Sequence, residues 1–203
     1  MSAVSEFDQT YATEQLRRSR HPLRRLIKHF YLENILRNVR GATIDFGCGA
    51  GQLLRRLPAG SIGLEVNASL VAALRTEGLD VAPYDPEQDQ LRLEGLQVGR
   101  YRTFVMAHVL EHIDDSAAAL RQIFQSCARL GVERVIIIVP GAKGFDSDAT
   151  HKTFVNRRYV QQHHLLNCEG YAMKSIGYFP GNWEWIGRYF VFHEFFIVYD
   201  REV

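Results

Sequence analysis

Hydrophobic and polar positions alternate at two different spacings along this chain of 203 residues. From Leu23 onward, apolar residues recur at intervals of three and four with charged residues between them, which predicts an amphipathic helix. We expect this helix to run from near His21 to Val39, because Pro22 is tolerated in a first helical turn and Gly41 stops a helix. A helix is therefore expected before the first strand.

Beyond Gly41, short apolar runs alternate with helical stretches. Such alternation predicts βαβ units, in which parallel strands form a sheet and helices cover its faces. The stretch between Glu87 and Gly99 has poor periodicity and indicates an element only weakly. The expected strands are Thr43–Phe46, Ile62–Val66, Val81–Tyr84, Phe104–Ala107 and Val135–Val139, and the expected helices are Gln52–Leu57, Ser69–Glu77 and Ala117–Leu130.

After Pro140 a polar loop precedes an expected helix at Arg157–Cys168, with Asn156 as its cap. Two last strands are expected near Ala172–Phe179 and Tyr189–Tyr199, joined by the turn residues Pro180, Gly181 and Asn182. A short connection of this kind makes two strands antiparallel. The pattern as a whole predicts an α/β fold with a mostly parallel seven-stranded sheet, an antiparallel last strand and helices on both faces.

Composition and charge narrow the possible partners. With 46% hydrophobic and 23% charged residues the chain has an ordinary globular composition, and its net charge of +1 provides no overall attraction to nucleic acid or membrane. Its three cysteines are widely separated, which favours reduced thiols over a disulfide framework. We expect a cytoplasmic protein, because neither a signal peptide nor an apolar run of about 20 residues is present.

The clearest chemical signal is a glycine-rich turn that follows the first strand. Gly47, Gly49 and Gly51 stand between the strand Thr43–Phe46 and the next expected helix. Glycines at such a turn permit positive φ and let the backbone approach a ligand closely. The segment therefore indicates a ligand site at the end of this strand, although a tight strand-to-helix turn can also use glycines for its geometry alone.

Further polar residues follow the next strands. Glu65 stands at the end of the second strand and Asp85 follows the third, while the fourth is followed by His108-Val109-Leu110-Glu111-His112. Ligands of open α/β sheets bind beyond the carboxyl ends of the strands, where a carboxylate can hold ribose hydroxyls. The glycine turn and these residues are thus expected along one edge of the sheet.

Together these residues resemble the class I, Rossmann-like S-adenosylmethionine-dependent methyltransferases, in particular the broad group whose fourth strand is followed by Val-Leu-Glu-His. The resemblance covers roughly residues 41–139 and the last strand pair, and it implies S-adenosyl-L-methionine as cofactor, with residues 41–203 as the catalytic domain and residues 1–40 as a helical lid or extension. It implies that Asp45 and the glycine turn hold the methionine part, Glu65 the ribose and Asp85 the adenine, with His108 beside the sulfonium. Many relatives have Asp, Asn or Ser where this chain has His108. The full implied set is Asp45, Gly47, Cys48, Gly49, Gly51, Glu65, Val66, Asp85, Ala107 and His108.

Two other enzyme classes share parts of these motifs. A dinucleotide-binding dehydrogenase requires Gly-x-Gly-x-x-Gly, whose third glycine would fall on Gln52. The residues His108–His112 match the His-x-x-Glu-His pattern of zinc metallopeptidases, but that chemistry requires the motif inside a helix. Here the motif directly follows a strand and no third ligand is recognisable, so we expect no metal.

The acceptor is less clearly indicated. His151, in the loop after the fifth strand, is the best candidate for a general base, because similar Thr-His segments occur there in relatives that act on small molecules; His112 is a weaker candidate. The aromatic turn Tyr178–Trp185 is expected to wall a pocket. We expect methylation of a small molecule, most simply on oxygen. The alternatives are RNA modification, suggested by the basic residues Arg17–Lys28, and a non-catalytic adenosyl-binding partner subunit.

Overall fold

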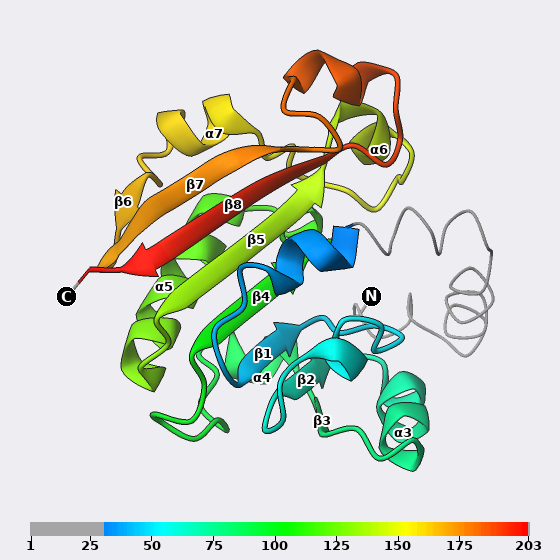
Figure 1. Ribbon diagram of the computed structural model, residues 1–203, viewed down its shortest axis with the longest axis vertical. Helices are drawn as coiled ribbons and strands as arrows, with labels where there is room; N and C mark the ends of the chain where they lie inside the picture. Colours follow the sequence, from blue (N-terminus) through cyan, green and yellow to red (C-terminus); the bar gives the residue numbers. More distant parts are fainter. Residues whose placement is uncertain (1–30, 203) are drawn as a thin grey trace.

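The computed structural model describes residues 31–202, which are built around a sheet of eight strands in the order β3-β2-β1-β4-β5-β8-β7-β6 (Figure 1). Five strands from β3 to β5 are parallel, and β8 runs antiparallel between β5 and β7. The strands are β1 (Thr43–Phe46), β2 (Ile62–Glu65), β3 (Val81–Pro83), β4 (Thr103–Ala107), β5 (Arg134–Pro140), β6 (Asn167–Cys168), β7 (Tyr171–Phe179) and β8 (Glu194–Arg201).

Helices connect the parallel strands and continue beyond the last of them. The α-helices are α3 (Ala68–Thr76), α4 (Pro86–Asp89), α5 (Ser116–Leu130), α6 (Ala142–Asp146) and α7 (Arg157–Gln162). The short 3₁₀ helices are η2 (Leu54–Arg56), η3 (Leu110–His112) and η4 (Glu184–Arg188). The predicted α/β fold with a mostly parallel sheet is confirmed.

The carboxyl-terminal part of the sheet corrects the predicted count of seven strands. The expected helix Arg157–Cys168 ends at Gln162, and Cys168 instead pairs with Tyr171 in a hairpin between β6 and β7. The two residues between them, Glu169 and Gly170, both have positive φ, at 53° and 77°. This backbone conformation matches the twist of a two-residue hairpin, which adds the eighth strand.

Two other boundaries differ from the predictions. The expected helix Gln52–Leu57 contains only the 3₁₀ turn η2, because the chain turns back toward β2 within a few residues. The last strand begins at Glu194, not near Tyr189, so β7 and β8 are joined by residues 180–193, which include η4. Figure 1 shows η4 and α6 together beyond the carboxyl end of β5. The long connection places side chains above the edge of the sheet where the glycine turn lies.

Both faces of the sheet are buried at the central strand β5. Alternate residues of β5 point to opposite faces, as strand geometry requires: Ile137 packs with α5, whereas Ile136 packs with Ile35 of the amino-terminal segment. Residues 31–36 are helical and are drawn in blue in front of the sheet in Figure 1. The end of the expected amino-terminal helix thus belongs to the core.

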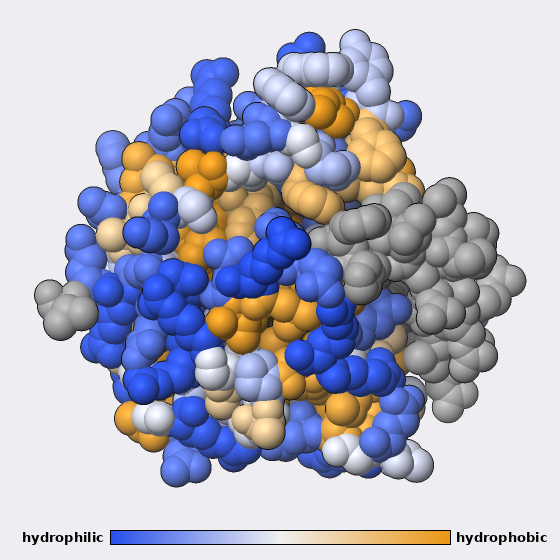
Figure 2. All heavy atoms as spheres, viewed as in Figure 1, coloured by the Kyte–Doolittle hydropathy of each residue, from blue (hydrophilic) through white to orange (hydrophobic). Residues whose placement is uncertain are grey.

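The remainder of that expected helix, from His21 to Phe30, and the basic residues Arg17–Lys28 lie outside the described residues. Figure 2 shows hydrophilic side chains over most of one face, with hydrophobic side chains between them near its centre. Within residues 31–202, no helix combines the length and apolar character that a membrane crossing requires.

Candidate active site

The glycine turn lies at the carboxyl edge of the sheet, between β1 and η2. Gly47, Gly49 and Gly51 all have positive φ, at 72°, 52° and 68°. A β-carbon on Gly47 would lie 2.4 Å from Val109 Cγ2, and one on Gly51 would lie 2.8 Å from Leu74 Cδ2. A β-carbon on Gly49 would meet no atom within 4 Å. Packing therefore requires two of the glycines, whereas the third borders open space that a ligand can occupy.

Glu65 lies directly against this turn. Its side chain is buried, and its two carboxylate oxygens accept hydrogen bonds from the backbone nitrogens of Gly49, at 2.8 Å, and Asn67, at 2.9 Å. Asp45, at the end of β1, is also buried. The structure thus brings together Asp45, the glycine turn and Glu65, as the sequence predicted from their positions at strand ends.

Cys48 packs within the turn. Its Sγ occupies the space beside Gly63, where a β-carbon would lie 2.7 Å away. Burial and the nearby carboxylates of Asp45 and Glu65 raise the pKa of the Cys48 thiol well above its ordinary range, so the thiol is not poised as a nucleophile. All three cysteines are free thiols in the structure.

Asp85 lies further along the same edge, after β3. Its carboxylate caps α4 by accepting hydrogen bonds from the backbone nitrogens of Glu87 and Gln88. Asp85 is exposed, and together with Tyr84 and Leu64 it lines a cavity of about 230 Å³. Val66, the residue after β2, is 44% exposed. Asp85 and Val66 are therefore both accessible to a ligand at this edge of the sheet.

His108 follows β4 and Ala107, and the chain turns there through a positive φ of 58°. Its imidazole Nε2 lies 3.1 Å from Glu194 Oε1, and its Nδ1 lies 3.4 Å from Glu111 Oε1. Burial by itself lowers the pKa of His108, but the two carboxylates outweigh it and raise the pKa to about 10. The His108 ring is therefore a cation at neutral pH, held between β4 and β8.

The loop after β5 folds back over η3. The backbone nitrogens of Lys152 and Thr153 donate hydrogen bonds to the carbonyl oxygen of Glu111, at 2.8 and 3.1 Å. This pairing places the ring of His151 4.7 Å from that of His112, measured between ring centroids. The two candidate catalytic histidines, 39 residues apart in sequence, are thus neighbours.

Glu111 is the third member of this cluster. Its side chain is almost fully buried, and ligand atoms of Glu111, His112 and His151 all lie within 4.8 Å of one another. The His-x-x-Glu-His pattern pointed to two of these residues, but the sequence did not identify His151 as a third because it lies on a different loop. The motif is in a strand-to-helix connection with the short turn η3, which excludes the helical arrangement of a metallopeptidase.

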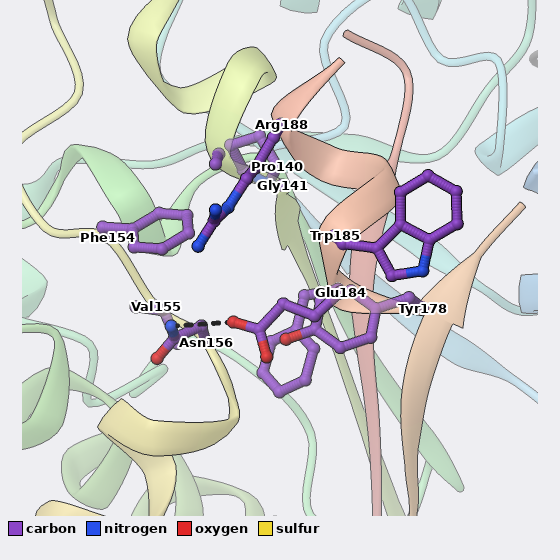
Figure 3. A pocket seen from close by; sticks show the side chains of 11 residues that line it. Pro140, Gly141, Phe154, Val155, Asn156, Tyr178, Glu184, Trp185 and Arg188 are labelled. Atoms are coloured by element: carbon purple, nitrogen blue, oxygen red, sulfur yellow. Dashed lines mark hydrogen bonds between the residues drawn. The ribbon is translucent and has the colours of Figure 1, made fainter. Parts of the chain in front are cut away.

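A larger cavity of about 390 Å³ lies beyond the end of β5, between α6, η4 and the residues before α7 (Figure 3). Tyr178 and Trp185 form part of its wall, as expected from the aromatic turn. The sequence did not identify its polar lining. Figure 3 shows Glu184 paired with Asn156, and Arg188 extending toward the space between Phe154 and Val155. The hydrogen bond from Asn156 Nδ2 to Glu184 Oε1 is 3.1 Å long.

Known structures share this architecture. A methyltransferase from Archaeoglobus fulgidus described as SAM-dependent is 16% identical, with a TM-score of 0.64 over 96% of this chain and 100% of that one. Magnesium protoporphyrin IX methyltransferase from Synechocystis PCC 6803, solved with bound SAH, is 13% identical, with a TM-score of 0.67 over 98% and 97%. A third similar structure, from Haloferax volcanii, is a complex between the Trm112 methyltransferase activator and a protein described as a methyltransferase. It is 14% identical, with a TM-score of 0.67 over 99% of this chain and 98% of that one.

Sequence comparison identifies the family. No curated protein sequence matches the chain. The family model of a methyltransferase domain matches residues 16–170, which include the glycine turn, Glu65, Asp85, the segment His108–His112 and His151. The chain therefore belongs to this methyltransferase-domain family, and it is a Rossmann-like enzyme that uses S-adenosyl-L-methionine as its methyl donor.

Proposed function

We propose that the enzyme transfers the methyl group of S-adenosyl-L-methionine to an oxygen atom of a small-molecule acceptor. The observation that carries this proposal is the cavity of about 390 Å³ beyond β5. Small-molecule sites have volumes of roughly 300–1,000 Å³ and combine apolar walls with a few polar groups. The aromatic wall and the three polar side chains Asn156, Glu184 and Arg188 match that description.

The cofactor end of the site fits an adenosyl group. The open space at Gly49 accommodates a ligand against the backbone, and the carboxylate of Glu65 is fixed beside it. We assign the methionine part to Asp45 and the turn Gly47–Gly51, the ribose to Glu65 and Val66, and the adenine to Asp85. When bound there, the cofactor supplies a methyl group already activated by its sulfonium.

The acceptor end is assigned to the loop after β5 and the connection η4. For a reaction of this kind the protein's main contribution is to align the acceptor oxygen with the methyl carbon and to exclude water, which can supply about 7–11 kcal/mol of barrier lowering. In the sheet β4 lies between β1 and β5. We therefore assign Ala107 and His108, at the end of β4, to the space between the cofactor and the acceptor. We assign the handling of the acceptor's proton to His151, with His112 beside it.

The orientation of the His151 ring supports this assignment. Its Nδ1 lies 2.8 Å from the carbonyl oxygen of Phe145, which can only accept a hydrogen bond. Nδ1 is therefore protonated, and in the neutral ring Nε2 carries the lone pair. With Nδ1 held in this way, the Nε2 lone pair is available to accept a proton.

A methyl-transfer screen tests the proposal. The full chain is incubated with S-adenosylmethionine labelled in its methyl group and with panels of phenols, carboxylic acids and sugars, and labelled products are identified by mass spectrometry. We expect turnover in at least one panel and a methyl group on oxygen. Turnover on RNA alone, or cofactor binding without turnover in any panel, would overturn the small-molecule assignment.

A pair of arginine variants connects that activity to the cavity. Arg188→Ala should raise KM for the acceptor by at least about 10-fold, the effect of losing one hydrogen bond to a charged group. Affinity for S-adenosylmethionine should stay unchanged, because the cofactor residues lie at other strand ends. The exposed Arg158, outside the cavity lining, provides the matched control Arg158→Ala. Equal KM values for the two variants would place the acceptor elsewhere.

A further inference from the structure

We propose that Glu111, His112 and His151 bind a divalent first-row transition-metal ion. One carboxylate and two imidazoles form a ligand set that suits zinc, iron, cobalt or manganese and leaves coordination positions open. We propose further that the open positions receive the acceptor oxygen, a role that rests on the proposed function. The metal site itself is independent of it.

The geometry of the three side chains is close to that of a bound site. Their ligand atoms lie within 4.8 Å of one another. Atoms bound to one zinc ion at about 2.0–2.1 Å lie roughly 3.4 Å apart in a tetrahedral site. Closure by little more than an ångström, within the range of side-chain rotation, would therefore complete three-point coordination.

The buried carboxylate of Glu111 is the strongest indication of a further ligand. It is only 1% exposed, and among the described residues neither oxygen has a hydrogen-bond partner. His108 Nδ1 and His151 Nε2 lie 3.4 and 3.9 Å from Glu111 Oε1. Since burial of an unsatisfied carboxylate is costly, buried charges are normally paired or bound to a metal. The His108 ring lies closer to Glu194, at 3.1 Å, so it is shared between two carboxylates. A further cation between Glu111, His112 and His151 would complete the pairing of Glu111.

In both histidines a hydrogen bond at Nδ1 leaves Nε2 as the nitrogen that can bind an ion. His151 donates from Nδ1 to the carbonyl of Phe145, which leaves the lone pair on Nε2. In His112, Nδ1 lies 3.1 Å from Thr150 Oγ1 and 3.4 Å from Thr150 O. The Thr150 hydroxyl donates its own hydrogen to Asp148 Oδ1 at 2.7 Å, so its oxygen accepts from His112. In both neutral rings Nε2 is therefore free to bind an ion.

The hydrogen bonds at Nδ1 of these two histidines are typical of metal-binding histidines. Such residues almost always donate their second ring nitrogen to a carbonyl, carboxylate or other polar group, which fixes the tautomer and the ring orientation. Here Phe145 fixes His151, and the pair Thr150–Asp148 fixes His112. His108 is not counted as a ligand, because Glu194 holds its ring at 3.1 Å.

An ion at this position would activate an acceptor hydroxyl. A bound divalent cation lowers the pKa of a coordinated hydroxyl, so its proton leaves to water on binding. In the transfer, the bond from the methyl carbon to sulfur breaks as the bond from that carbon to the acceptor oxygen forms. The electron pair of the broken bond remains on sulfur. In this arrangement both histidines act as ligands, and the ion takes over the activation of the acceptor.

Titration of the chelator-treated, full-length protein with Mn²⁺, Co²⁺, Zn²⁺ and Mg²⁺ tests the site by calorimetry. We expect one transition-metal ion per chain and much weaker binding of Mg²⁺, which prefers oxygen ligands. Bound Co²⁺ should give visible absorption bands that report nitrogen coordination. Absence of saturable binding by any transition-metal ion would overturn the proposal.

Variants localise the binding. His151→Ala and Glu111→Gln should each abolish saturable binding, and Thr150→Val, an exposed change that removes only the partner of His112, should weaken it by about 10- to 100-fold. His163→Ala removes an exposed histidine outside the cluster and should leave binding unchanged. Circular dichroism verifies that each variant is folded. Equal affinity in wild type, His151→Ala and Thr150→Val would show that the ion binds elsewhere.

The same samples separate the two proposals. Binding of S-adenosylmethionine and turnover with the acceptor found in the screen are measured with and without metal. Metal binding at the three residues without any acceptor turnover would overturn the proposed function and leave the metal site standing. Turnover in chelated protein at the full rate, with no binding of any of the ions, would overturn the metal site and leave the proposed function standing.

Discussion

At the scale of single residues, the glycine turn contains two closely packed glycines and a third, Gly49, that borders open space. Gly49→Ala places a methyl group in open space, so it should destabilise the fold only by the cost of a left-handed alanine, about 1–2 kcal/mol. Affinity for S-adenosylmethionine should fall more than about 10-fold, because that space is part of the cofactor site proposed above. Calorimetry and urea unfolding measure the two effects.

Gly47→Ala is the matched comparison, since it introduces the same strain at a φ of 72° and also a contact of 2.4 Å with Val109. Overpacking of this kind adds about 1–3 kcal/mol of destabilisation. The expected order is therefore a larger loss of stability for Gly47→Ala than for Gly49→Ala. If Gly49→Ala binds the cofactor like wild type, the open space is not the cofactor site.

Glu65 provides a second prediction at this scale. Glu65→Ala should weaken binding of S-adenosylmethionine by roughly 10- to 150-fold, which corresponds to the loss of hydrogen bonds to a charged acceptor worth about 1.5–3 kcal/mol. Its carboxylate also anchors Gly49 and Asn67, so a modest loss of stability should accompany this effect. Glu77→Ala, in an exposed ion pair with Arg55, is the control. An unchanged dissociation constant for Glu65→Ala would exclude it from the cofactor site.

At the scale of elements, an ion pair fixes the antiparallel strand β8 to β5. Arg134 Nε and Nη2 donate to the two carboxylate oxygens of Asp200, at 2.7 and 2.8 Å, and the Arg134 side chain is mostly buried. Hydrogen bonds from Arg134 outweigh burial and lower the pKa of Asp200 below its ordinary range. The pair therefore stabilises the fold above the unfolded-state pKa of about 3.9, and this contribution is lost as the pH falls through the lower folded-state value.

Asp200→Asn should accordingly reduce the free energy of unfolding by about 1.5–3 kcal/mol at neutral pH. The difference between variant and wild type should shrink as the pH falls below about 3.9. Urea unfolding of both proteins, from neutral pH to below about 3.9, measures this difference. Asp80→Asn, in an exposed pair with Arg100, should cost only about 0–1 kcal/mol. A difference between Asp200→Asn and wild type that does not change with pH would contradict the assignment to this ion pair.

At the scale of the whole molecule, binding of the cofactor should stabilise the fold. The residues that we assign to the cofactor come from the ends of β1, β2, β3 and β4, so unfolding of the sheet would remove the proposed site altogether. S-adenosylmethionine at 100 times its dissociation constant should add about 2.7 kcal/mol and raise Tm by about 5–11 °C. Nicotinamide dinucleotides should leave Tm unchanged. A shift with dinucleotides alone would contradict the cofactor assignment.

Local signals in the sequence determined the parallel part of the sheet and the cofactor edge. The buried strand β5 and helix α5, with Asp115 capping its start and Gly131 in a left-handed conformation at its end, carry strong periodicity and explicit start and stop residues. The glycine turn and Glu65 follow from the rule that ligands bind at the carboxyl ends of parallel strands. These features depend only on neighbours in the chain or on strand order.

Only the tertiary structure decided what meets beyond that edge. The hairpin between β6 and β7 and the long connection to β8 depend on pairing between strands, which periodicity does not specify. The cluster of Glu111, His112 and His151 requires the loop after β5 to cross η3, a contact between segments far apart in sequence. The cavity beyond β5, where we propose that the acceptor binds, likewise draws its lining from several separate segments. Composition and local pattern hold no information on such distant contacts, because packing of the whole chain creates them.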